Sequence, residues 1–128
     1  MVNGLHHYNL IPEDEDHWTT NSGMFLNGKK VCLTGFLDTG NNLYDPYQKR
    51  PIIVINKEVL KGYKPRCILV PCVTVKGSGF IKCFKTKKIV INKKEIENEC
   101  LVGISDNKFE IDGVDLLLHK KIIKEIEK

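Results

Sequence analysis

The feature that most constrains this chain is an apolar run that ends abruptly in a polar loop. The run Lys30–Phe36 has the length and composition of a β-strand, and the loop Leu37-Asp38-Thr39-Gly40-Asn41-Asn42 follows it directly. Gly40 permits a positive φ and a close approach to a ligand, because it has no Cβ. Thr39 supplies a hydroxyl that can bond its own or a neighbouring backbone. The pattern predicts that Asp38 lies where a buried strand breaks into a tight loop.

Two apolar residues followed by Asp38-Thr39-Gly40 resemble the active-site signature of aspartic peptidases. The longer string GFLDTGNNLYDP, residues 35–46, resembles more specifically the sporulation sigma-E factor processing peptidases of endospore-forming bacteria. Members of that family are membrane proteins with a C-terminal domain similar to a retroviral protease. The resemblance covers roughly residues 29–120. It implies that Asp38 is the catalytic carboxylate and that three residues support its loop: Thr39, Gly40 and Asn41.

The remaining pattern is that of a β protein with short strands. Asn27-Gly28 is a strong hairpin signal, and Asp112-Gly113 predicts a second hairpin between residues 109–111 and 114–118. Pro51–Ile55 is an apolar run of strand length, predicted to be buried on both faces. The isoleucines of the tail have helical spacing and predict a helix over residues 120–128.

Two further segments carry the family resemblance. Gly77-Ser78-Gly79-Phe80-Ile81 resembles the glycine-rich tip of the retroviral protease flap, a hairpin that folds over bound peptide; an ordinary β-hairpin is the alternative. Pro71, in the strand before it, is expected at a sheet edge or a bulge. Leu101-Val102-Gly103 resembles the second signature of the pepsin-like half-barrel. In that fold this strand packs across the catalytic loop, and the glycine lets the two backbones approach.

These features together predict an all-β fold. The expected architecture is a closed half-barrel like that of pepsin or a retroviral protease, with a glycine-tipped flap and a short C-terminal helix. We expect the peptidase domain to span residues 25–128 and residues 1–24 to form a poorly ordered leader or linker. The flap residues expected to bind substrate are Gly77, Ser78, Gly79 and Phe80.

Hydrolysis of a peptide by this route needs two carboxyl groups that share one proton and hold one water. The chain has one Asp-Thr-Gly loop, so two copies of Asp38 across a two-fold axis are required. The resemblance therefore implies a homodimer, a sigma-factor precursor as protein substrate, an activating protein, and no metal or cofactor. The side chain of Asn41 either tunes the carboxyl pair or caps the loop, and the sequence leaves both roles open.

Composition bears on location and partners. Residues 1–28 hold four acidic residues and no Lys or Arg, so the remainder has 20 basic and 12 acidic residues, a net charge of +8. Such a body suits an anionic membrane surface or an acidic partner, and a lysine-rich solvated surface is the simpler interpretation. Five cysteines without Cys-x-x-Cys spacing favour reduced thiols over a zinc site.

No apolar run reaches the roughly 18 residues of a membrane helix, and the start lacks the features of a signal peptide. We expect a soluble chain at the cytoplasmic face, without the membrane-spanning part of the family. Two other functions remain open: a catalytically silent module of the same fold that binds peptide or dimerises, and a basic nucleic-acid-binding domain. Few aromatic residues interleave with the lysines to stack bases, so we expect no nucleic-acid partner.

Overall fold

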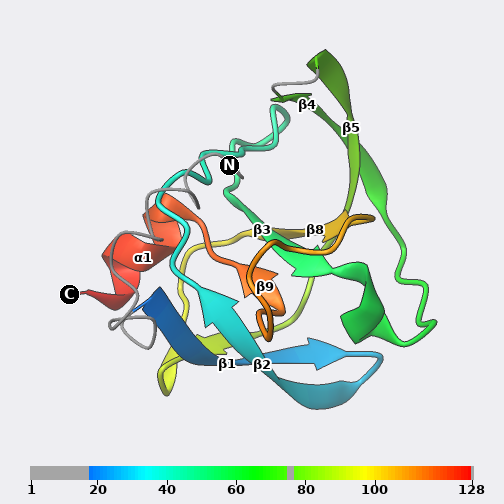
Figure 1. Cartoon of the computed structure of the whole chain (residues 1–128). Helices are drawn as coiled ribbons and strands as arrows, with labels where there is room; N and C mark the ends of the chain where they lie inside the picture. Colours follow the sequence, from blue (N-terminus) through cyan, green and yellow to red (C-terminus); the bar gives the residue numbers. More distant parts are fainter. Residues whose placement is uncertain (1–17, 75–76, 128) are drawn as a thin grey trace.

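The computed structural model of this protein describes residues 18–74 and 77–127. Within these residues, nine strands form one sheet in the order β4-β5-β8-β3-β9-β2-β1-β6-β7, with one short α-helix, α1, at its side (Figure 1). The predicted all-β class and the C-terminal helix are therefore confirmed. The strands are β1 Thr19–Leu26, β2 Lys29–Phe36, β3 Ile52–Asn56, β4 Ile68–Thr74, β5 Gly77–Phe84, β6 Ile89–Ile91, β7 Lys94–Glu95, β8 Leu101–Ser105 and β9 Leu116–Leu117; α1 spans Lys120–Ile126.

The first hairpin joins β1 and β2 through Asn27 and Gly28, as predicted. Both residues have a positive φ, 52° and 76°, which the tight two-residue turn of a hairpin requires. β1 begins at Thr19, inside the segment expected to be a leader, and the side chain of Met24 is fully buried in the core. The ordered β structure thus starts upstream of residue 25, while residues 1–17 lie outside the described part of the chain.

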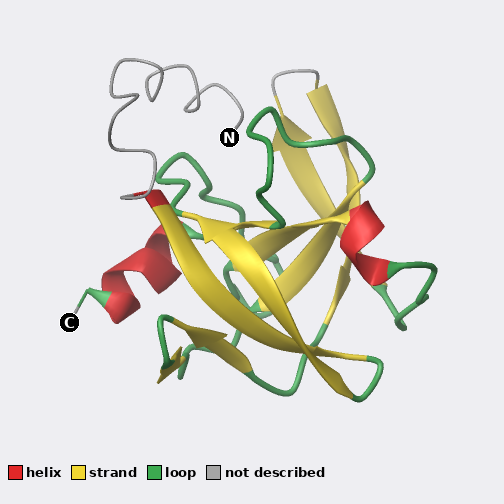
Figure 2. Ribbon diagram, turned by 60° about the horizontal axis from the view of Figure 1, so that its bottom comes forward, coloured by secondary structure: helices red, strands yellow, loops and turns green. Residues whose placement is uncertain are grey.

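β3 occupies the centre of the sheet and is buried on both faces, as its apolar sequence predicts. It runs parallel to β8 and antiparallel to β9. After β3, Asn56 caps a 3-10 turn, Lys57–Leu60, by accepting a hydrogen bond from the Glu58 amide. This turn lies on the opposite side of the molecule from α1 (Figure 2).

β4 and β5 form a hairpin that projects from the body of the sheet (Figure 1). β4 is an edge strand, which explains how the sheet accommodates Pro71 without losing a ladder hydrogen bond. The glycines expected at the tip lie slightly farther along: β5 already begins at Gly77, and Gly79 pairs with Cys72. Residues 75–76, between β4 and β5, lie outside the described residues.

The hairpin predicted around Asp112-Gly113 does not form. Gly113 has the positive φ of a turn, 79°, but residues 109–111 are not a strand. The backbone and carboxylate of Asp115 bond instead to Thr34 of β2, and its carbonyl accepts from the Asn56 amide. β9 is consequently inserted between β2 and β3, where it pairs with both strands rather than with the segment before the turn.

The core joins strands from both ends of the strand order. Met24 of β1, Ile53 of β3, Phe84 of β5 and Leu116 of β9 belong to one buried cluster, which also takes in Ile122 of α1. A sheet whose distant strands share one core must curl around it, and Figure 2 shows that curvature. The helix closes the cluster with the apolar spacing that predicted it.

No helix among the described residues is long and apolar enough to cross a membrane. The same part of the chain contains no group of three or more His, Cys, Asp or Glu side chains placed to hold a metal ion. The five cysteines are free thiols.

Candidate functional site

The Asp38 loop connects the end of β2 to the segment that leads into β3. The carbonyl of Phe36, the last residue of β2, accepts hydrogen bonds from the Asp38 amide and from the Leu118 amide, both at 2.9 Å. Because β9 lies between β2 and β3, the loop must pass over the end of β9 to reach β3. The loop is thus held against three strands of the sheet.

The Asp38 carboxyl is fully buried. Its Oδ1 accepts a hydrogen bond from the Gly40 amide at 3.0 Å, whereas its buried Oδ2 has no partner among the described residues. Burial raises the pKa of Asp38 above its ordinary value, and the Gly40 hydrogen bond opposes this effect. A buried carboxyl group with a raised pKa is a candidate for acid–base chemistry.

Asn41 fastens the loop to the sheet. Its side-chain Nδ2 donates to the Ile52 carbonyl of β3 at 2.9 Å and to the Leu117 carbonyl of β9 at 3.5 Å. Its Oδ1 accepts from the Leu43 amide at 3.1 Å, and the side chain is fully buried. Of the two roles that the sequence left open for Asn41, these contacts support the anchoring of the loop.

Gly35, which belongs to the signature string, leaves room for two side chains of the neighbouring strand β1. A Cβ added to Gly35 would lie 2.8 Å from Thr20 Oγ1 and 2.9 Å from Ser22 Oγ, two buried hydroxyls that hydrogen-bond each other. A larger residue at position 35 would therefore displace β1 from β2 directly before the loop.

A groove of about 640 Å³ lies between the segment after the loop and the β4–β5 hairpin. Three of the residues expected to bind substrate line it: Ser78, Gly79 and Phe80. Asn42, Leu43 and Tyr44 form the facing wall, and the Phe80 side chain is 70% exposed. Gly77 and the Asp38 carboxyl are not among the residues that line the groove. Thr39 is exposed and Gly40 is half-buried.

The residues expected to form the second-signature strand lie in a strand that is not paired with β2. Leu101, Val102 and Gly103 lie in β8, which pairs with β3 and β5. The strand bonded to the end of β2 is β9. Gly103 is needed for another reason: an added Cβ would lie 2.7 Å from Ile81 Cδ1 and 3.0 Å from Ile52 Cγ2, so it accommodates side chains of β5 and β3.

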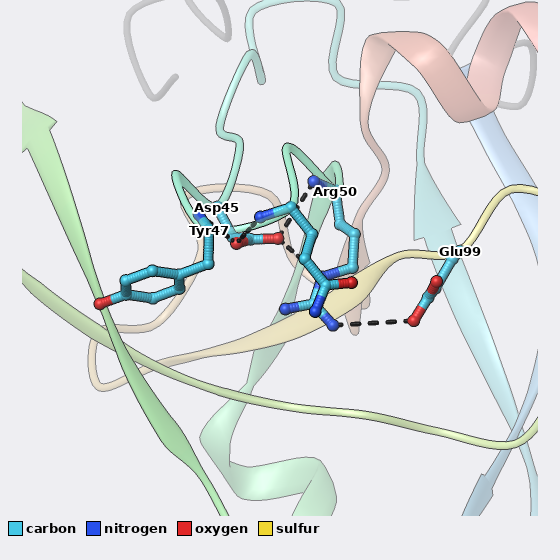
Figure 3. A network of polar contacts seen from close by, with 5 residues as sticks. Asp45, Tyr47, Arg50 and Glu99 are labelled. Carbon is cyan, nitrogen blue, oxygen red and sulfur yellow. Dashed lines mark hydrogen bonds and ion pairs between the residues drawn. The ribbon is translucent and has the colours of Figure 1, made fainter.

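Sequence reasoning missed an ion pair that shapes the groove wall (Figure 3). Arg50 Nε donates to Asp45 Oδ2 at 2.7 Å, and both side chains are buried. The Asp45 carboxylate also accepts from the amides of Tyr47, Gln48 and Arg50. Burial opposes the charge on Asp45, but these bonds hold its pKa well below the ordinary value. The Asp-Pro turn at residues 45–46 was the available signal.

Two contacts connect the turn at residues 45–50 to neighbouring strands. Tyr47 donates its hydroxyl to the Leu69 carbonyl of β4 at 3.2 Å, and Arg50 Nη1 lies 3.7 Å from a carboxylate oxygen of Glu99, before β8 (Figure 3). The segment from Asp45 to Arg50 therefore links the loop side of the groove to the hairpin side.

A second missed residue is His119, which is fully buried between β9 and α1. Its Nδ1 accepts a hydrogen bond from the Lys121 amide at 2.9 Å, which caps the helix. Its ring meets that of Tyr44 edge to face, with centroids 4.6 Å apart. Burial lowers the pKa of His119 to about 4. A lone histidine before a basic tail gave no sequence signal for this role.

Comparisons with known proteins agree with the sequence resemblance. Residues 14–69 match the family model described as "Sporulation factor SpoIIGA". This match includes the Asp38 loop and begins upstream of the expected start at residue 29. A protein of Clostridium acetobutylicum named "Probable sporulation sigma-E factor-processing peptidase" is 34% identical over 83 residues. That alignment covers 59% of this chain and 31% of the relative, so the chain spans about a third of the curated protein's length. These two matches support the resemblance of this chain to the sporulation sigma-E factor-processing peptidases.

Proposed function

We propose that this chain is the aspartic endopeptidase domain of a sporulation sigma-factor processing protease, and that it acts as a homodimer. The observation that carries the proposal is the Asp38 carboxyl: it is buried, its pKa is raised, and its Oδ2 has no partner among the described residues. The family match over residues 14–69 and the printed name of the relative support a peptidase of a sporulation factor.

The chemistry requires a second carboxyl group. In an aspartic dyad one carboxyl remains protonated and donates to the scissile carbonyl oxygen, while the other accepts a proton from the attacking water. Thr39 is one of the two exposed residues of the loop, with Asn42, which suits contact with a second copy of the loop across a two-fold axis. The two Oδ2 atoms would then satisfy each other, directly or through the shared proton and water.

The fold expected for this function is a retroviral-type half-barrel in which the β4–β5 hairpin is the flap. The groove under the hairpin suits an extended peptide, because strands β4 and β5 form one wall and both walls carry apolar side chains. The substrate would be the N-terminal pro-segment of a sigma-factor precursor, unfolded over several residues. An activating protein and a membrane anchor in the longer protein would act by raising the local concentration of domains.

The direct test is cleavage of a pro-sigma substrate by wild type and by Asp38→Asn, with the oligomeric state measured by sedimentation in each sample. A forced dimer, made by fusing a parallel coiled coil to the chain, should cleave the pro-segment, and Asp38→Asn in the same fusion should be inactive. Cleavage by the Asp38→Asn dimer would refute the aspartic mechanism. No cleavage by a verified wild-type dimer, with the activator supplied, would refute the processing role.

One observation favours a second function. In the single chain the Asp38 carboxyl is fully buried and does not line the groove, so the groove can bind a peptide without contact to a catalytic group. A silent peptide-binding or dimerisation module of the same fold would show this arrangement permanently. The two functions differ in the forced dimer: the silent module binds a pro-segment peptide with the same affinity in wild type and Asp38→Asn, and neither protein cleaves it.

A further inference from the structure

We propose that His119 is a positioning residue for the Asp38 site, and that its neutral imidazole holds the start of α1, the Asp38 loop and the Tyr44 wall of the groove in one arrangement. This inference rests on the proposed function for its catalytic consequence. The bracing itself is a property of the fold and can be tested without any activity.

The residues on either side of His119 brace the loop on either side of Asp38. The Leu118 amide donates to the Phe36 carbonyl at 2.9 Å, two residues before Asp38. The Lys120 amide donates to the Asn41 carbonyl at 3.3 Å, three residues after it. The segment 118–120 therefore spans the base of the loop, and His119 is the residue at its centre.

The side chain of His119 fixes this segment through the helix that follows. Nδ1 accepts the Lys121 amide, which satisfies one of the amides that a helix leaves without an intrahelical partner. An acceptor nitrogen carries no proton, so the ring is neutral with its hydrogen on Nε2. An imidazolium has no acceptor, and protonation would release the Lys121 amide and the start of α1.

The same ring supports the wall of the groove. The His119 and Tyr44 rings pack in a T-shaped arrangement with an interplanar angle of 76°, a favourable geometry for an aromatic pair. Tyr44 in turn lines the groove opposite the hairpin. Loss of the ring would leave Tyr44 without this support. One side chain thus acts on both the carboxyl loop and the surface proposed to receive the peptide.

The surroundings of His119 keep it neutral. Nε2 is buried and has no hydrogen-bond partner among the described residues. Burial lowers the pKa, the Leu43 backbone opposes this, and the charge of Lys121 on α1 lowers it further. From the groove side the ring faces the phenol of Tyr44. The expected consequence is that acid, by charging His119, disorders the loop.

Two variants separate the cap from the ring. His119→Asn keeps a short side-chain acceptor for the Lys121 amide, since asparagine is a good helix cap, but removes the ring. His119→Ala removes both. We expect kcat to fall about tenfold or more in His119→Ala, because a small displacement of a catalytic group is costly. In His119→Asn we expect kcat to recover to within about threefold of wild type, with a raised KM from the unsupported Tyr44.

The pH profile of kcat is the second readout. Its acid limb should move to lower pH in His119→Asn, which has no titrating ring. A residue with only a structural role would lower the stability of both variants without separating kcat from KM and without moving the acid limb. Wild-type kcat in folded His119→Ala would overturn the proposal.

The bracing is tested in an Asp38→Asn background, where neither catalysis nor the Asp38 titration contributes. The amide resonances of Gly40, Asn41 and Lys121 are followed by NMR from pH 7 to pH 3. They should move together with the His119 ring, with a midpoint near pH 4, and this transition should be absent when His119→Asn is added. If Gly40 and Asn41 do not follow the ring, the proposal is wrong even if cleavage is observed. If they follow it while no variant cleaves peptide, the proposed function fails and the bracing stands.

Discussion

The buried Asp45–Arg50 pair allows a prediction whose size follows from the structure. Asp45 is fully buried and Arg50 is 6% exposed, with a 2.7 Å bond between Oδ2 and Nε. Asp45→Asn keeps the shape of the side chain but removes the charge. It leaves the guanidinium in the interior without its counter-charge, and the loss of one partner of a buried pair costs about 3–5 kcal/mol. Since whole domains are stable by about 5–15 kcal/mol, the loss is a large share of the stability of the fold.

Urea unfolding followed by the fluorescence of Trp18 would measure this cost. With a slope of about 1–3 kcal/mol/M, the predicted loss moves the midpoint down by more than about 1 M. Glu99→Gln is the matched control: Glu99 is 65% exposed and 3.7 Å from Arg50, so its removal should cost less than about 1 kcal/mol. Adding Arg50→Met to Asp45→Asn should restore part of the loss, because the uncompensated charge is gone. A cost below 1 kcal/mol for Asp45→Asn would refute the reasoning.

The pH dependence gives an independent check on the same pair. The folded-state pKa of Asp45 lies far below its ordinary value of 3.8. Its ionised form therefore contributes stability that is fully present above about pH 4 and is lost as the pH falls through the folded-state pKa. The difference in unfolding free energy between wild type and Asp45→Asn should narrow steadily below pH 4. A difference that stays constant from pH 7 to pH 3 would show that the charge of Asp45 is not the cause.

Three further predictions concern the loop. Gly35→Ala should destabilise the protein by about 1–3 kcal/mol in urea unfolding, because its Cβ would meet two buried hydroxyls; Gly23→Ala, where the nearest atom is the flexible end of a lysine, should be near neutral. Asn41→Ala should cost about 2 kcal/mol, since it leaves buried backbone carbonyls without their donor, and a cost below 0.5 kcal/mol would contradict the anchoring role. Asp38→Asn should abolish cleavage, a loss of at least about 10²-fold. The pKa of Asp38 is raised in the folded state, so the folded protein loses stability as the pH rises through that pKa and the carboxyl ionises. Asp38→Asn removes this cost and should therefore raise the melting temperature at pH 7 and not at pH 3.5. Equal gains at both pH values would exclude ionisation as the cause.

Local signals predicted the elements whose structure is decided locally. Asn27-Gly28 specified its hairpin because the turn needs two residues that tolerate a positive φ. The run of apolar residues in β3 correctly predicted burial on both faces, and Pro71 correctly predicted a strand at the edge of the sheet. Each of these rules depends on the backbone or the burial of the segment itself, so the sequence of that segment was sufficient.

Predictions failed where partners come from distant parts of the chain. Asp112-Gly113 forms a turn, but the strand after it, β9, pairs with β2 on one side and β3 on the other. A hairpin with the preceding segment would have given β9 hydrogen bonds to that one segment only. Gly103 does accommodate a close approach, though of side chains from β5 and β3 rather than of the Asp38 loop. The burial of Asp45 and Arg50 was also invisible, because charged residues next to a turn are usually exposed.

The burial of Asp38 links these observations to the need for a second chain. A carboxyl group that is buried with one unsatisfied oxygen is costly to the isolated fold, and natural domains keep few such groups. The loop nevertheless has a complete set of supports: Asn41 binds β3 and β9, and the segment 118–120 bonds the backbone on both sides of Asp38. Supports of this kind hold the carboxyl at the end of the sheet instead of letting it turn outward to water. In the proposed homodimer, a second copy of the loop would supply a partner for Oδ2, which has none among the described residues. The cost of this buried oxygen, which has no partner among the described residues, supports the proposal that the loop functions in a homodimer.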